Sequence, residues 1–282
     1  LLGLLLATTL ATGTSSRRRD LGSGLREIEF NMAPNSFDDQ YRGCRRAMNR
    51  RLPGLNRSEF VVNNDYAETW AKATARWYGR GSHAGSQLRP ELAVALLAYS
   101  MEDGLYKGFN RAIRTAGRSH REYLRHFHFK VVHFLLTEAL YELRGAQSHP
   151  RCLRVFRGTD GVRFIARRDQ VVRFGQFAST SLRRNVSEFY GNETFFEIDT
   201  CHGASVRNFS LYPEEDEVLI PPFETFKVTR VTHRGNKTQM WLRAHGAHSN
   251  YNCVWLRGDV PGAGDTGTGR GWHRGTGTRW GG

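Results

Sequence analysis

The stretch SHREYLRHFHFKVVHFLLTEALYELRGAQSHPRCLRVFRG, residues 119–158, contains the change of pattern that decides the fold. Its first part opens on a helix-capping pair, Ser119 and Glu122, and ends at Gly145. Between them apolar side chains recur at helical spacing, at Tyr123, Phe127, Val131, Phe134, Leu135 and Ala139. From Cys152 the apolar spacing changes to two, as in CLRVFRG, which predicts strands.

The same two patterns continue on either side. Upstream, Asp65 and Glu68 resemble a capping box that opens the helix DYAETWAKATARWYGRG, and RPELAVALLAYS has Pro90 at a first helical position. Downstream, Gly, Pro and Asn turns separate short strand-like runs, namely QFASTSL (176–182), TFFEIDT (194–200), DEVLIPP (216–222), ETFKVTRV (224–231), TQMWLRAH (238–245) and YNCVWLRG (251–258). Helices followed by strands predict an α+β fold. No G-x-G-x-x-G joins a strand to a helix, so a Rossmann nucleotide site has no support.

Composition bounds the class of protein. The 282 residues are 39% hydrophobic and 24% charged, which is typical of a globular chain with a sizeable core. Lys and Arg number 41 against 27 Asp and Glu, which gives a net charge of +14. This charge predicts attraction to polyanions, but it does not choose between nucleic acid, anionic membranes and sulphated glycans.

The two ends of the sequence predict a secreted protein. Residues 1–20 open with LLGLLLATTLATGTSS, an apolar run too short to span a bilayer and typical of a secretory signal peptide, with its start truncated. The alternative is a buried N-terminal helix. Residues 259–282 are rich in Gly and Thr and predict a disordered tail. Because no apolar run follows Val260, we expect neither a transmembrane helix nor a GPI anchor.

The cysteines and sequons agree with that route through the endoplasmic reticulum. The four cysteines lie far apart without a CxxC pair, which predicts two disulfides of open connectivity and not a zinc site; they are Cys44, Cys152, Cys201 and Cys253. Five N-x-S/T sequons are candidate glycosylation sites, at Asn56, Asn185, Asn192, Asn208 and Asn236. We expect the mature protein to be a monomeric glycoprotein.

Four consecutive acidic residues, 214–217, stand out in so basic a chain. If Glu215 and Glu217 lie in extended backbone, their side chains project from the same face of a strand. Crowding of two carboxylates raises the pKa of one of them, which suits the stabilisation of a cation or the movement of a proton. The alternative is a solvated acidic turn.

Three further features carry weaker signals. Arg157 ends a strand-like run before Gly158, where a guanidinium could bind a phosphate in bidentate fashion, although most arginines of such a chain are surface residues. Ser179, Thr180 and Ser181 offer hydroxyls, with Ser179 and Ser181 on one face, but no G-x-S-x-G hydrolase motif surrounds them. The spacing of the histidines does not converge on a metal; they are His126, His128 and His133.

Three of these motifs follow one another along the chain, namely VFRG, FASTS and EEDEVLIPP. They present, in this order, an Arg, a Ser-Thr-Ser run and a Glu-x-Glu pair. This order resembles the R–S–E signature of the vertebrate ecto-type NAD(P)+–arginine mono-ADP-ribosyltransferases. The resemblance covers about residues 25–258, which we expect to form a single catalytic domain. It includes NNDYAETW, LAVALLAYS, YLRHFHFKVVHFLLTEAL, RFGQFASTSL and all four cysteine positions.

The resemblance implies a role for each residue of the signature. Arg157 would hold NAD phosphate, and Ser179 would orient the catalytic glutamate, Glu217. Glu217 would bind the ribose and stabilise its developing positive charge as nicotinamide leaves. Glu215 would engage the acceptor guanidinium, and Gly158, Gln176 and Ser181 would complete the cofactor site.

The resemblance also implies the remaining chemistry. It pairs Cys44 with Cys253 and Cys152 with Cys201. It implies a helical N-terminal part packed on a mixed or antiparallel β-sandwich. The donor would be NAD, with NADP as an alternative, the acceptors would be protein arginines, and no metal would take part. Phe177 and Phe196 are candidates for stacking on nicotinamide, with core packing as the favoured role of both.

Two other functions stay open. An NAD glycohydrolase would use water in place of arginine, although hydrolysis does not need the second glutamate. A catalytically inactive module would bind glycans or anionic cell surfaces through its basic charge. The secretory features and the site argue against a nucleic-acid partner.

Overall fold

The computed structural model describes residues 26–81, 86–101, 105–146 and 152–257. The predicted signal peptide (1–20) and the predicted tail (259–282) lie outside the described residues. Within these ranges, none of the helices combines the length and the apolar character that crossing a bilayer requires.

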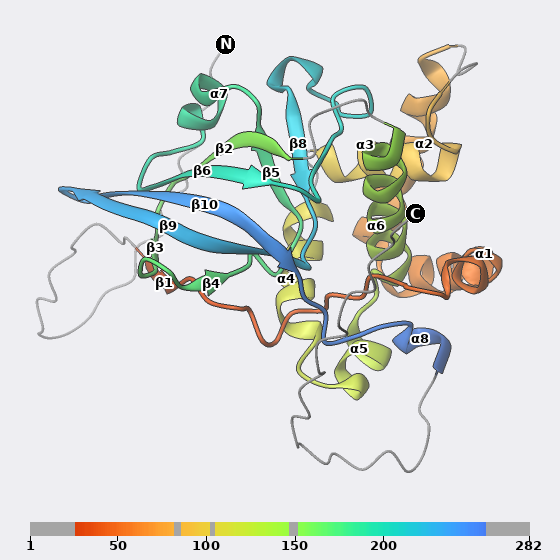
Figure 1. Ribbon diagram of the computed structural model, residues 1–282. Helices are drawn as coiled ribbons and strands as arrows, with labels where there is room; N and C mark the ends of the chain where they lie inside the picture. Colours follow the sequence, from red (N-terminus) through yellow and green to blue (C-terminus); the bar gives the residue numbers. More distant parts are fainter. Residues whose placement is uncertain (1–25, 82–85, 102–104, 147–151, 258–282) are drawn as a thin grey trace, which may run out of the picture.

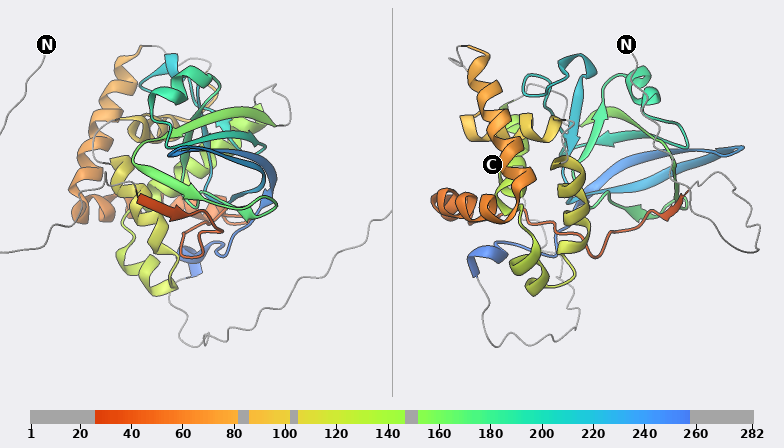
Figure 2. Two further views of the ribbon diagram at one scale, coloured as in Figure 1. Left: turned by 90° about the vertical axis from the view of Figure 1, so that its left-hand side faces the viewer. Right: turned by 180° about the vertical axis from the view of Figure 1, so that it is seen from behind.

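The N-terminal half is helical. After the short strand β1 (Arg26–Glu29), six helices follow in order: α1 (Arg45–Val62), α2 (Asn64–Gly79), α3 (Pro90–Ser100), α4 (Leu105–Ala116), α5 (His120–His126) and α6 (Lys130–Ala146). They lie together beside the sheet, on the side away from the tip of its long β9–β10 hairpin (Figures 1 and 2). Pro90 occupies the first turn of α3, as the sequence predicts.

Two details of these helices differ from the sequence predictions. The cap of α2 is Asn63, whose side chain accepts a hydrogen bond from the Tyr66 N–H, and not Asp65. Ser119 caps its helix as predicted, but the single helix expected over 119–145 is wrong. The chain breaks after α5, and α6 starts anew because the buried Glu59 carboxylate accepts from the N–H groups of Lys130 (2.8 Å) and Val131 (3.1 Å).

The C-terminal half forms the sheets. Its strands are β2 (Leu153–Thr159), β3 (Val162–Ile165), β4 (Val171–Val172), β5 (Ala178–Ser181), β6 (Thr194–Thr200), β7 (Ala204–Ser205), β8 (Glu217–Ile220), β9 (Glu224–Arg234) and β10 (Lys237–Ala247). One mixed sheet has the order β4-β9-β10-β6-β2-β5-β8-β7, in which β10 and β6 are parallel. A second sheet pairs β1 with β3. The helix α7 (Arg184–Phe189) and the 3₁₀ turn η1 (Pro213–Glu215) interrupt the strands.

Residues 251–257 do not form the strand predicted for 251–258, of which residue 258 lies outside the described residues. Val254–Arg257 form a short helix, α8. The N–H of Val254 donates to the buried Asp39 carboxylate at 3.2 Å, and Cys253, at a φ of 61°, is bonded to Cys44. These tertiary contacts turn the chain away from the sheet.

Two apolar cores hold the layers together. The larger core fills the helical half and reaches the sheet at Ala204 of β7 and Leu219 of β8. Phe177 and Phe209 join it from the loops beside these strands. The smaller core lies between the strands of the sheets and includes Phe30 and Phe196. The α+β class, with a helical part packed on a mixed β-core, is therefore confirmed.

Covalent and ionic contacts tie distant segments together. The structure contains both disulfides that the resemblance implies, Cys44–Cys253 and Cys152–Cys201. A fully buried ion pair joins Arg173 to Asp38 at 2.6 Å. Arg173 also donates to the carbonyls of Met32, Ala33 and His248. This network fixes residues 31–38 along the wall of the cavity described next.

Candidate active site

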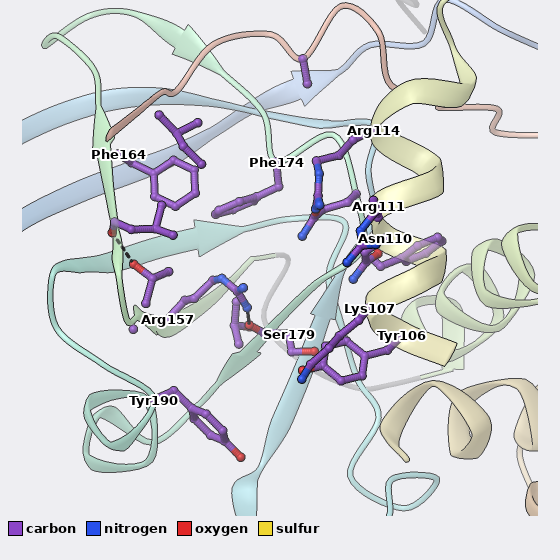
Figure 3. A pocket seen from close by; sticks show the side chains of 18 of the residues that line it. Tyr106, Lys107, Asn110, Arg111, Arg114, Arg157, Phe164, Phe174, Ser179 and Tyr190 are labelled. Atoms are coloured by element: carbon purple, nitrogen blue, oxygen red, sulfur yellow. Dashed lines mark hydrogen bonds between the residues drawn. The ribbon is translucent and has the colours of Figure 1, made fainter. Parts of the chain in front are cut away.

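A cavity of about 900 Å³ lies between α4 and the strands β2, β5 and β8. Figure 3 shows its two sides, with residues of α4 on one and Tyr190, at the end of α7, on the other. All the signature residues line this cavity; they are Arg157, Ser179, Glu215 and Glu217. Residues that are 60 positions apart in sequence meet here because β5 lies between β2 and β8 in the sheet.

Arg157 is held against the neighbouring strand. Its Nη1 donates to the backbone carbonyl of Ser179 at 2.5 Å (Figure 3). Burial lowers the pKa of Arg157, while Tyr99, Tyr106 and Glu217 raise it. The guanidinium is thus fixed in position on the cavity floor, with donors left for a ligand.

Glu217 is the buried carboxylate of the site. It begins β8, opposite Ser181 of β5, and only 7% of the residue is exposed. Burial raises its pKa, and the negative charge of Glu215 raises it further. Hydrogen bonds from Ser179 and Ser210, together with the charge of Arg157, lower it. This carboxylate lies where a positive charge on a ligand would be strongly stabilised.

Glu215 reaches the cavity by a different route from the predicted one. The expectation that it shares extended backbone with Glu217 is wrong, because Glu215 ends the η1 turn and Asp216 takes a left-handed conformation with a φ of 47°. The turn is fixed by Ser181, whose hydroxyl donates to the Glu215 carbonyl at 2.5 Å, and by the Arg207–Asp216 ion pair at 2.8 Å. The Tyr190 hydroxyl donates to the Glu215 carboxylate.

The other three candidate ligand residues also line the cavity. The lack of a side chain at Gly158 lets the backbone at Ser187 and Gly191 pack against it, since a Cβ there would lie 2.2 Å from the carbonyl oxygens of both residues. Gln176 accepts a hydrogen bond from Arg114. Ser181 uses its hydroxyl within the Glu215 turn.

One whole wall of the cavity was missed by the sequence analysis. Five side chains of α4 line it, namely Tyr106, Lys107, Asn110, Arg111 and Arg114 (Figure 3). Their spacing places them along one helical face, and that periodicity in LYKGFNRAIRTA is the signal that could have identified them. Asn110 also donates to the hydroxyl of buried Tyr99, whose pKa burial raises to about 12.

The aromatic and histidine candidates lie mainly in the cores. Phe177 lines the cavity but is 1% exposed and packs on Phe109, and Phe196 is buried between the sheets. His133 bonds to the Tyr41 hydroxyl, and burial lowers its pKa to about 3. Among the described residues, no three His, Cys, Asp or Glu side chains gather as a metal site would require.

The fold and this set of side chains define an ADP-ribosyltransferase. The family model for NAD:arginine ADP-ribosyltransferases matches residues 30–250. The chain belongs to this family.

Named relatives agree with this assignment. The chain is 48% identical over 259 residues to the NAD(P)(+)–arginine ADP-ribosyltransferase 2 of Gallus gallus, covering 91% of this chain and 81% of that protein. It is 47% identical over 255 residues to the GPI-linked NAD(P)(+)–arginine ADP-ribosyltransferase 1 of Homo sapiens, covering 85% and 77%. The enzymatic activity of the present chain is the transfer of ADP-ribose from NAD+ to arginine with release of nicotinamide.

Solved structures agree as well. The eukaryotic mono-ADP-ribosyltransferase ART2.2 is 34% identical, with a TM-score of 0.69 and coverage of 81% of this chain and 99% of that one. A mutant of ART2.2 in complex with NADH has a TM-score of 0.67, 33% identity and the same coverage.

Proposed function

We propose that Glu217 is the catalytic carboxylate of this transferase, that Ser179 and Arg157 position it, and that Glu215 directs the reaction to protein arginines. The observation that carries the proposal is the burial of Glu217 within a cavity, hydrogen-bonded by Ser179, on strands that also present Arg157. A buried carboxylate of this kind stabilises positive charge more strongly than a solvated one.

The donor binds between α4 and β2. NAD carries a negative diphosphate, and the cavity offers the cationic side chains of Arg157, Lys107, Arg111 and Arg114. The charges of Arg26 and Arg111, after burial, lower the pKa of Arg114, which means that these cations repel one another. A bound anion relieves that repulsion, and the 2′-phosphate of NADP would add a further anionic group. Gln176, Gly158 and Ser181 line the same space.

The reaction breaks the bond between the ribose C1′ and the nicotinamide nitrogen. The bonding electron pair leaves with nicotinamide, which becomes neutral, and positive charge develops on the ribose. Glu217 stabilises that charge in the transition state more than in the ground state, as catalysis requires. A nitrogen of the acceptor guanidinium then forms the new bond to C1′. Glu215 orients this guanidinium and accepts the proton that it loses.

The decisive test replaces Glu217 with Gln, which keeps its volume and removes its charge. We expect ADP-ribose transfer and nicotinamide release both to fall by about 10²–10³-fold, the size of losing one group that stabilises the transition state. The matched control is Glu59→Gln, another buried glutamate, which lies outside the cavity. Equal transfer by the wild type and Glu217→Gln would show that the assignment is wrong.

Replacing Glu215 with Gln separates transfer from hydrolysis. Water needs no carboxylate to orient a guanidinium, so arginine transfer should fall by at least tenfold more than NAD hydrolysis. An equal loss of both reactions would remove the proposed acceptor role. Nicotinamide release measured with and without an arginine acceptor reports the two reactions.

We also propose that the enzyme works outside the cell. The two disulfides support an oxidising compartment. Four of the sequon asparagines are exposed, at positions 185, 192, 208 and 236, whereas Asn56 is half-buried and accepts a hydrogen bond from Tyr66. Glycosylation is therefore proposed at the four exposed sites. Secretion without an anchor, a monomeric state and contact with glycans or anionic surfaces stay predictions.

A further inference from the structure

An exposed surface beside the cavity combines apolar and acidic side chains. Phe189 is 87% exposed, Tyr190 is 53% exposed and Leu182 is 42% exposed. We call this group, together with Glu214 and Glu215, the α7 surface. Single exposed apolar residues are common on proteins, but large ones adjoining a functional site point to binding.

The α7 surface is continuous with the active site. Tyr190 lines the cavity, and its hydroxyl donates to the Glu215 carboxylate. The Phe189 ring lies edge-on to that of Tyr190, with centroids 5.8 Å apart. The backbone N–H of Leu182 donates to the Asp216 carbonyl at 3.1 Å, which joins the apolar residues to the acidic turn.

The chain has a net charge of +14, but carboxylates gather at the α7 surface, together with the exposed Arg183, whose Nη1 donates to the Glu214 carbonyl at 3.1 Å. Asp216 is neutralised by Arg207 at 2.8 Å. Glu214 is exposed, and within the described residues its carboxylate makes no ion pair. Arg184 pairs with both Glu188 and Glu197 at 2.8 Å, so carboxylates still outnumber guanidinium groups around the α7 surface. A cationic segment would therefore be attracted to this edge of the cavity and repelled by much of the remaining surface.

We propose that the α7 surface binds the polypeptide around the target arginine and selects acceptors with an apolar side chain about one to three residues from it. This inference rests on the proposed role of Glu215. With the guanidinium at Glu215, the neighbouring residues of the acceptor pass over Tyr190 toward Phe189. An extended chain advances about 3.3 Å per residue, so a nearby apolar side chain reaches the Phe189 ring.

The test compares two arginine peptides that differ in the residues flanking the arginine, leucine in one and glycine in the other. For the wild type we expect kcat/KM to be about fivefold to tenfold higher with the leucine-flanked peptide, as partial burial of an apolar side chain predicts. Phe189→Ala should reduce that ratio to about one, and Phe189→Leu should restore most of it. Thermal unfolding checks that the variants are folded.

The matched control is Val61→Ala, which removes an apolar side chain that is 85% exposed on α1 and should leave the ratio unchanged. A wild-type ratio near one, or a ratio that survives in Phe189→Ala, would overturn the proposal. Transfer by the wild type to arginine methyl ester, which has no flanking residues, reports the proposed function separately. Its absence would refute that function and this inference with it.

Discussion

The carboxylate of Glu217 lies buried near the negative charge of Glu215, and this arrangement predicts a pH effect on activity. Burial and the Glu215 charge both raise the pKa of Glu217. The ionised form of Glu217 stabilises the ribose cation, so activity falls as the pH drops through this raised pKa. In Glu215→Gln the repelling charge is gone and the pKa of Glu217 falls. The acid limb of the pH profile should therefore move to lower pH.

This shift is measured by nicotinamide release in the absence of an arginine acceptor, because hydrolysis does not use the proposed acceptor role of Glu215. Glu188→Gln, which changes an exposed carboxylate of α7, is the control and should leave the limb in place. An acid limb that stays in place or moves to higher pH in Glu215→Gln would contradict the proposed pair.

Glu224 predicts a pH effect on stability. Its fully buried carboxylate accepts from Thr200 Oγ1 at 2.5 Å and from the N–H groups of Cys201 and His202. Burial raises its pKa from 4.5 to about 7, against these hydrogen bonds and the charge of Arg144. Between about pH 4.5 and pH 7, Glu224 is therefore protonated in the folded state and ionised in the unfolded state. The stabilisation is complete below about pH 4.5 and is lost as the pH rises through about 7.

Glu224→Gln should remove this dependence. The free energy of unfolding of the wild type, relative to the variant, should decrease by at most about 3 kcal/mol between pH 5 and pH 8. Denaturant titrations of both proteins across that range measure the difference. Parallel curves would show that Glu224 has the same pKa in the folded and unfolded states.

At the scale of elements, α4 supplies the cationic wall. Arg111→Gln and Arg114→Gln should each raise the KM for NAD about tenfold, the size expected for losing a charge-assisted hydrogen bond to phosphate. The increase in KM should be larger for NADP than for NAD, because NADP carries an additional phosphate. Initial rates with both donors measure the effect.

Arg118→Gln tests whether total charge explains this result. Arg118 is exposed just beyond α4 and does not line the cavity. Its substitution removes the same unit of charge and should change KM by less than about twofold. A change in KM equal to that of Arg111→Gln would indicate general attraction by the basic surface and not contact with the donor.

The sequence predicts a helix or strand correctly where contacts between neighbouring residues determine it, and it fails where contacts with distant residues do. Periodicity correctly indicates the helical half and the strand half, and Pro90 marks α3. The start of α6 was missed because its cap, Glu59, lies 71 residues away. The helix α8 was missed because Asp39 and the disulfide at Cys253 override the strand propensity of its residues.

The same distinction applies to the site. The ordered motifs place Arg157, Ser179 and Glu217 in one cavity, because each lies on a strand. The extended conformation predicted for Glu215 is wrong, because Asp216 has a left-handed backbone conformation, is paired with Arg207 and interrupts the strand. The α4 wall carries no compact motif, so only its helical spacing could have revealed it.

At the scale of the whole molecule, the two disulfides close loops of very different length. Cys44–Cys253 spans 209 residues and Cys152–Cys201 spans 49. The entropy of an unfolded chain predicts a stabilisation of about 5 kcal/mol for the longer loop and about 4 kcal/mol for the shorter one. The shorter bridge should also contribute less to stability because Leu153 and Thr200, which lie beside it, are already paired in the sheet.

We therefore expect replacement of both Cys44 and Cys253 with Ser to lower Tm by about 10 °C or more, since about 1 kcal/mol corresponds to 2–4 °C in a domain of this size. Replacement of Cys152 and Cys201 should lower Tm by less. Thermal unfolding of the two double variants at one pH and one salt concentration measures both shifts. The opposite order would mean that strain or residual structure in the unfolded chain outweighs loop length, so that the bridge between β2 and β6 is the main covalent support of the fold.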